Sequence, residues 1–214
     1  MKKAIIFDMD GVISDTQKFH ATAEHTLLKK FGIEMDPEVI TRKYAGISDE
    51  QMFREIFYKN RVVVNDIKDV IFDKWNIMGK LSRGKITAMP HALTCISLVK
   101  RGGLKLAIAS ASTRDFITHV LDSLHIKDTF DVVVSAQEVE YGKPAPDIFL
   151  LAASRLELEP KECIVIEDGL SGVVAARKAG MKSVGLVTNQ NNSLPADLVV
   201  SSLNQITLDK IRML

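Results

Sequence analysis

The chain has 214 residues, of which 46% are apolar, and its 28 lysines and arginines nearly balance its 27 aspartates and glutamates. This length suits one domain with a sizeable insertion, or two small domains. A formal net charge of +1 excludes the strongly basic surface that nucleic acids and anionic membranes attract, so we expect neither as a partner.

The cysteines and the first residues indicate where such a protein works. Cys95 and Cys163 are far apart and lie within apolar runs, which suits small buried side chains better than a disulfide or a zinc site and indicates a reducing compartment. The apolar segment after Lys2 and Lys3 ends at Asp8, too soon for a signal peptide, and no run is long enough to span a membrane. We therefore expect a cytoplasmic globular protein.

Short apolar segments rich in isoleucine, valine and leucine recur along the chain and indicate the buried strands of a parallel sheet. They occupy residues 4–7, 104–109, 132–134, 164–166 and 184–187. Helical patterns alternate with them at residues 92–101, 116–124, 146–156 and 173–179. This alternation predicts an α/β fold with a doubly wound parallel sheet, and the polar segment 188–193 predicts a loop.

The alternation is interrupted between about residues 16 and 86, where the pattern is helical throughout. Apolar side chains recur every four residues from position 19 to position 31, as on one face of a helix. Because this segment follows the first strand directly, we expect a helical cap over the carboxyl end of the sheet, where ligands bind in open α/β folds. The predicted domains are a core of residues 1–15 and 84–214 and a cap of residues 16–83.

Two pairs of carboxylates follow buried strands. Asp8 and Asp10 end the first strand segment, and Glu167 and Asp168 end the segment at residues 164–166. Carboxylates beside a core are costly unless they are paired, hydrogen-bonded or bound to a metal. Because the carboxyl ends of parallel strands converge, the four acids suit a hard divalent ion such as Mg²⁺, without which repulsion would raise their pKa values. The alternative is a pair of strand-end turns with solvated acids.

Two further strand ends carry groups that suit an anion. The turn of residues 110–113, Ser-Ala-Ser-Thr, offers hydroxyl and backbone N–H groups for phosphate oxygens, although serines in this position also serve as helix caps. Lys143 lies in a loop with two prolines, which predicts a rigidly held cation where most lysines are mobile surface groups.

Taken together, these residues resemble the four motifs of the haloacid dehalogenase-like superfamily. The matching positions are Asp8-Met9-Asp10-Gly11-Val12, Ser110, Lys143 and Glu167-Asp168. The resemblance covers essentially the whole chain. The extended motifs DMDGVISDT, AIASAS and GKPAPDIF are most similar to the branch that contains β-phosphoglucomutase and small phosphosugar phosphatases.

The resemblance implies a role for each catalytic residue. Asp8 is the nucleophile that attacks phosphorus and becomes an aspartyl-phosphate. Asp10 protonates the leaving oxygen and then activates water or an acceptor hydroxyl, and we expect crowding among the acids to keep it protonated for that purpose. Ser110 hydrogen-bonds the transferring phosphoryl group, and Lys143 neutralises its charge. These roles meet the demands of phosphoryl transfer, which are positioning and charge compensation.

The resemblance also implies a metal site and substrate contacts. Mg²⁺ is held by the Asp8 side chain, the Asp10 carbonyl and Asp168, with Glu167 as a direct or water-mediated ligand. Substrate contacts are expected from four further residues, namely His20, Ala111, Ser112 and Arg114. His20 aligns with a cap histidine of the mutase-like branch, although a lone histidine on a helix often only packs. Arg114 would reach a phosphate from the core side through its bidentate guanidinium.

The sequence thus predicts a Mg²⁺-dependent phosphatase that hydrolyses a small phosphorylated metabolite, with a sugar phosphate as the expected substrate, and we expect a monomer. β-Phosphoglucomutase, which interconverts β-glucose 1-phosphate and glucose 6-phosphate, is the first alternative. In that enzyme the cap loop that aligns with residues 45–49 carries basic residues, whereas this chain has Ala45 and Asp49. A non-catalytic binding module is disfavoured because every motif residue is present. A dehalogenase is disfavoured because it would need neither Asp10 nor the metal site.

Overall fold

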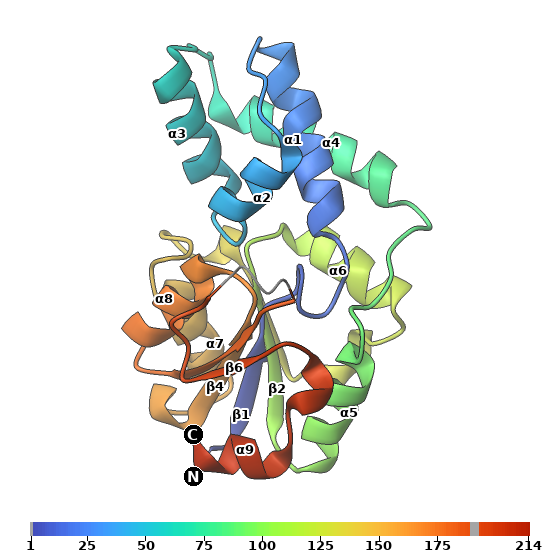
Figure 1. Ribbon diagram of the computed structural model, residues 1–214, viewed down its shortest axis with the longest axis vertical. Coiled ribbons are helices and arrows are strands. Elements are labelled where there is room, and N and C mark those ends of the chain that lie inside the picture. The colour runs from blue at the N-terminus through green and yellow to red at the C-terminus, as the bar shows by residue number, and fades with distance from the viewer. Residues whose placement is uncertain (1, 189–192) are drawn as a thin grey trace.

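The computed structural model describes residues 2–188 and 193–214 (Figure 1). Its centre is a parallel sheet with the strand order β3-β2-β1-β4-β5-β6. The strands are β1 (Ala4–Phe7), β2 (Lys105–Ser110), β3 (Val132–Ser135), β4 (Cys163–Glu167), β5 (Lys182–Leu186) and β6 (Leu198–Val200). The chain winds outward from the central β1 in both directions, so the predicted doubly wound sheet is confirmed.

Five of these strands coincide with the predicted segments to within about two residues, and β6 was not predicted. β6 has three residues and lies at the edge of the sheet, and only Val200 in it is buried, so it lacks the long apolar run of a central strand. Most of the loop predicted at residues 188–193 lies outside the described residues.

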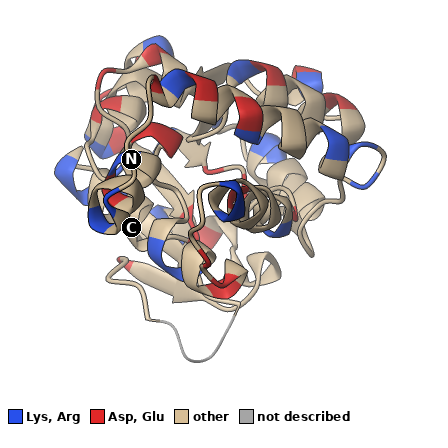
Figure 2. Cartoon of the chain, turned by 90° about the horizontal axis from the view of Figure 1, so that it is seen from above, with Lys and Arg blue, Asp and Glu red and all other residues tan. Residues whose placement is uncertain are grey.

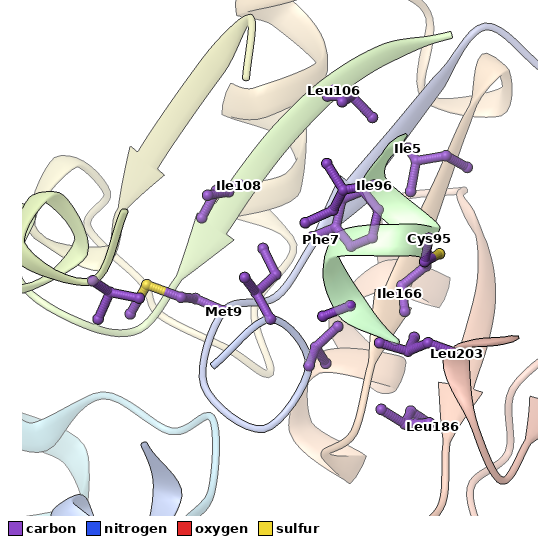
Figure 3. Packing of buried hydrophobic residues seen from close by; sticks show 14 of the residues in the cluster. Ile5, Phe7, Met9, Cys95, Ile96, Leu106, Ile108, Ile166, Leu186 and Leu203 are labelled. Carbon is purple, nitrogen blue, oxygen red and sulfur yellow. The ribbon is translucent and has the colours of Figure 1, made fainter. Parts of the chain in front are cut away.

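Helices cover both faces of the sheet, and this explains why its strands are apolar throughout. The core helices are α5 (Ala92–Arg101), α6 (Arg114–Ser123), α7 (Asp147–Arg155), α8 (Leu170–Lys178) and α9 (Leu208–Met213). On one face, Ile5 and Phe7 of β1 pack in a cluster with residues of α5, α6 and α9 (Figure 3). On the other face, Ala4 and Ile6 pack with residues of α7 and α8. Alternate residues of one strand therefore serve two separate cores.

Four helices inserted between β1 and β2 form a cap that stands above the carboxyl end of the sheet (Figure 1). They are α1 (Gln17–Lys30), α2 (Pro37–Tyr44), α3 (Asp49–Asn60) and α4 (Ile67–Ser82). The cap has an apolar core of its own, which includes Leu28, Ile40 and Phe53. The predicted helical insertion between the first two strands is thus confirmed.

Charged residues of both signs are interspersed over the helices seen from above (Figure 2), in agreement with the small net charge. None of the helices in residues 2–188 and 193–214 combines the length and the hydrophobicity that a membrane crossing requires.

The start of α8 offers a test of this packing, because Gly172 lies against the end of β4. A Cβ added at Gly172 would lie 1.8 Å from Oε1 of the buried Glu167. We expect Gly172→Ala to lower the free energy of unfolding by about 1–3 kcal/mol, the usual cost of overpacking. Gly79 in α4 has no atom within 4 Å of an added Cβ, so Gly79→Ala should raise that free energy by roughly 0.5–1 kcal/mol. Urea denaturation measures both, and a Gly172→Ala protein as stable as the wild type would contradict this packing.

Candidate active site

The first strand delivers two aspartates to the carboxyl edge of the sheet. The N–H of Asp8 donates to the carbonyl of Ile166 at 2.9 Å, which continues the pairing of β1 with β4 by one residue. The chain then turns at Gly11, whose φ is +88° and whose added Cβ would lie 2.1 Å from Oδ2 of Asp168. Only glycine fits such a conformation so close to another side chain. The turn after Asp8 and Asp10 consequently packs against Asp168, which follows β4, and both aspartates are buried.

Lys143 is the cation of this cluster, and it is almost completely buried. Its Nζ donates to Oδ1 of Asp8 at 2.5 Å, to Oε1 of Glu167 at 2.8 Å and to the carbonyl of Ala109 at 3.0 Å. Burial lowers the pKa of Lys143, but the two carboxylates outweigh burial and hold that pKa above its usual value. A fixed positive charge therefore lies in contact with Asp8.

Three of the acids form a group that could hold a metal ion. Carboxylate oxygens of Asp8, Glu167 and Asp168 all lie within 4.8 Å of one another. Burial raises the pKa of Asp8 to about 8 against the opposing charge of Lys143, and Glu167 adds to the rise. Burial, Glu167 and Asp8 likewise hold the pKa of Asp168 well above its usual value. The cluster thus has more negative charge than Lys143 neutralises, and its hard oxygen donors fit Mg²⁺.

The carboxylate of Asp10 points to different partners. It accepts hydrogen bonds from Ser112 Oγ at 2.7 Å, from Ser110 Oγ at 3.3 Å and from the hydroxyl of Thr16. His20 Nε2 lies 3.2 Å from its Oδ1. Burial raises the pKa of Asp10, but His20 and these donors outweigh burial and hold that pKa below its usual range. The prediction that crowding keeps Asp10 protonated is therefore wrong for this arrangement, because hydrogen-bond donors stabilise the ionised form.

His20 connects Asp10 to a buried lysine of the cap. Lys74 Nζ lies 2.9 Å from His20 Nδ1, 2.7 Å from Oδ1 of Asp49 and 3.6 Å from Oε1 of Glu24. Because an ammonium group only donates, His20 Nδ1 accepts this hydrogen bond, and its Nε2 hydrogen goes to Asp10.

Sequence reasoning missed Lys74. It lies four residues from each of two buried side chains of α4, Val70 and Met78. That spacing is typical of one helix face, and it was the signal that this lysine points inward.

A pocket between cap and core brings most of the predicted substrate contacts together. Its lining includes Asp8, Asp10, His20, Ala111 and Ser112. The rest of the lining comes from the cap, namely Gln17, Glu24, Ile40, Thr41, Tyr44, Ala45, Gly46, Ile47 and Asp49.

Arg114, in contrast, lies elsewhere. It is the first residue of α6, and its Nη1 donates to the carbonyl of Val133 at 2.7 Å and lies 4.0 Å from Oε1 of Glu138. The side chain therefore runs along the β3 side of the core, where the strand's carbonyl satisfies it. The sequence predicted that Arg114 contacts the substrate. The structure does not place Arg114 in the lining of the pocket, so this prediction is wrong for this arrangement.

Known proteins resemble the chain in sequence and in structure. The family described as Haloacid dehalogenase-like hydrolase matches residues 5–186. Beta-phosphoglucomutase of Bacillus subtilis (strain 168) is 32% identical over 213 residues, which cover 97% of this chain and 92% of the relative. A phosphorylated carbohydrates phosphatase of Thermotoga maritima is 30% identical over 194 residues, which cover 89% of this chain and 88% of the relative.

Among solved structures, β-phosphoglucomutase from Clostridium difficile is similar with a TM-score of 0.90 and 33% identity, over 100% of this chain and 96% of that one. The family match extends through the core strands β1 to β5 and the whole cap. The chain therefore belongs to the haloacid dehalogenase-like hydrolases, in the branch of the β-phosphoglucomutases and the phosphosugar phosphatases.

Proposed function

We propose that this protein is a Mg²⁺-dependent phosphatase that hydrolyses a phosphorylated sugar through an aspartyl-phosphate at Asp8. The observation that carries the proposal is the contact of Asp8, which lines the pocket, with the buried ammonium of Lys143. A nucleophilic carboxylate approaches an anionic phosphate only where positive charge compensates both. The relative named for phosphorylated carbohydrates supports the substrate class.

In the first step, an oxygen of Asp8 bonds to phosphorus while the bond from phosphorus to the sugar oxygen breaks. Lys143 offsets the charge that gathers on the phosphoryl oxygens. Ser110, the last residue of β2, and the turn through Ala111 and Ser112 that follows it donate hydrogen bonds to those oxygens. Asp8, Glu167 and Asp168, with the Asp10 carbonyl, would hold Mg²⁺, which when bound screens the repulsion between carboxylate and phosphate.

Asp10 handles the protons of both steps. The ionised Asp10 is poised as the base that takes a proton from water when the aspartyl-phosphate is hydrolysed. To protonate the leaving sugar oxygen in the first step, the carboxyl group of Asp10 has to carry a proton before that step begins. A bound phosphate places negative charge beside Asp10 and raises its pKa in that direction.

The two aspartates have separable roles, and this is the test of the proposal. Asp8→Asn removes the nucleophile and should abolish phosphate release. Asp10→Asn keeps the nucleophile, so it should still form the aspartyl-phosphate slowly from p-nitrophenyl phosphate, whose good leaving group needs no acid. Acid quenching and mass spectrometry measure the phosphorylated protein. Near-normal turnover by Asp8→Asn would show that the nucleophile lies elsewhere.

Lys143 should contribute mainly through its charge. We expect Lys143→Ala to lower kcat/KM about a hundredfold or more, as removal of a preorganised electrostatic group does. Lys105→Ala is the control, because Lys105 Nζ donates to the carbonyl of Leu156 at the far end of β2. Steady-state kinetics on proteins with matched circular dichroism spectra make the comparison, and equal losses in the two variants would contradict the role of Lys143.

Mg²⁺ should bind the acidic cluster even without substrate. We expect it to raise the melting temperature of the wild type in proportion to its binding, and excess chelator to abolish activity. Asp168→Asn should remove both the shift and the activity, whereas Asp115→Asn, an exposed acid of α6, should retain them. Differential scanning fluorimetry measures the shift, and full activity in excess chelator would overturn the metal assignment.

A mutase is the second candidate, because two of the similar proteins are β-phosphoglucomutases at 32% and 33% identity. The deciding assay supplies β-glucose 1-phosphate with a trace of glucose 1,6-bisphosphate and follows both products. We expect inorganic phosphate to exceed glucose 6-phosphate, because no lysine or arginine among the described residues lines the pocket to hold a second phosphate. Glucose 6-phosphate formed faster than phosphate would reverse this ranking.

A further inference from the structure

The cap side of the pocket presents carboxylates where a substrate's far end would lie. Asp49 and Glu24 both line the pocket, and their side chains retain 14% and 10% exposure. Within the described parts of the chain, no lysine or arginine contributes to this lining. A substrate whose phosphate reaches Asp8 therefore meets acceptor groups, and no exposed cation, at its other end.

The cation that contacts Asp49 and Glu24 is already engaged. Lys74 is fully buried, its Nζ lies 2.7 Å from Oδ1 of Asp49, and its remaining partners are His20 and Glu24. Among the described residues, no donor contacts Oδ2 of Asp49. An incoming anion would have to displace Asp49 to reach Lys74, whereas a hydroxyl group could donate directly to the free oxygen.

The path from the reacting end to Asp49 is short. Asp10 contacts His20 at 3.2 Å, His20 contacts Lys74 at 2.9 Å, and Lys74 contacts Asp49 at 2.7 Å. One imidazole ring and one ammonium group thus separate the two carboxylates. Asp10 and Asp49 thus line the same pocket, Asp10 from the core and Asp49 from the cap.

We propose that Asp49, paired with Lys74, is a specificity-determining residue that selects sugar or polyol monophosphates with a hydroxyl-bearing, uncharged far end and rejects those with a second anionic group. This inference rests on the proposed phosphatase function and names its substrate class. A carboxylate in the wall costs an anionic ligand free energy through repulsion, and such a repulsive element is a common source of specificity.

The competing explanation is that Asp49 is only structural. It is the first residue of α3, where negative charge suits the helix dipole, and it balances the buried Lys74. A structural role predicts that Asp49→Asn lowers stability and weakens all ligands alike. A specificity role predicts that the ratio between neutral and anionic ligands changes.

The experiment compares sorbitol 6-phosphate with 6-phosphogluconate, which share a six-carbon chain and differ in whether C1 is a hydroxymethyl or a carboxylate group. Binding is measured by calorimetry with Mg²⁺ in Asp8→Asn protein, which cannot turn either ligand over. We expect the neutral-ended ligand to bind at least about tenfold more tightly, and Asp49→Asn in the same background to reduce this preference to about threefold or less.

Glu50→Gln is the matched control, because Glu50 is the next residue of the same helix turn and pairs with Arg54 in solvent at 2.7 Å. It should keep the full preference, and Asp49→Glu, which keeps the charge, should keep most of it. If Asp49→Asn proves too unstable, Glu24→Gln provides the second test, with a smaller reduction expected. Equal affinities in the parent protein, no binding of sorbitol 6-phosphate, or an Asp49→Asn effect that is equal on both ligands would overturn the proposal.

A separate measurement distinguishes this proposal from the proposed function. Wild-type protein with Mg²⁺ is assayed for phosphate release from three compounds, namely p-nitrophenyl phosphate, sorbitol 6-phosphate and 6-phosphogluconate. Release without any preference would overturn the role of Asp49 and leave the phosphatase intact. A binding preference that depends on Asp49, with no release from any compound, would overturn the phosphatase and leave the selectivity of the pocket.

Discussion

The site depends on one buried ammonium group placed between two buried carboxylates. Lys143 contacts Asp8 at the end of β1, Glu167 at the end of β4 and the carbonyl of Ala109 in β2. Burying three charges is costly, and the cost is offset only when contacts are close and complete. Gly172 leaves the room that Glu167 needs. The strands β1, β2 and β4 are thus held relative to one another by the same charge that the proposed mechanism uses.

Two aspartates only two residues apart consequently have opposite acid–base properties. Asp8 lies among other acids without enough positive charge, so burial raises its pKa to about 8. Asp10 is just as buried, but hydroxyl donors and His20 surround its carboxylate and hold its pKa low. When their surroundings shift the pKa values of two carboxylates in opposite directions, one site can obtain two different roles from a single residue type. Neither property follows from the residue type alone.

The sequence predicted what depends on local pattern and failed where distant contacts decide. Apolar runs ended by acids located β1 and β4 and the acids Asp8, Asp10, Glu167 and Asp168, because a buried strand and its polar end are both written in adjacent residues. Lys74 was missed, and the contact predicted for Arg114 was wrong, because a long cationic side chain reaches partners several ångströms away. Which partner it finds depends on how cap helices and strands pack, and no local pattern states that.

The cap is seated on the catalytic core at the segment that leads into Asp49. Ser171 Oγ in α8 donates to the carbonyl of Ala45 at 3.0 Å. The next residue, Gly46, has a φ of +75°, and an added Cβ there would lie 2.8 Å from Ser171 Oγ. Ser171 lies three residues after Asp168, so the start of α8, next to the acidic cluster, also supports the cap loop. The cap loop that leads into Asp49 is therefore positioned by the segment that directly follows Asp168. If a phosphate binds at Asp8 as proposed, this packing of the cap on the core sets its distance from Asp49, and with it the length of substrate that the pocket accepts.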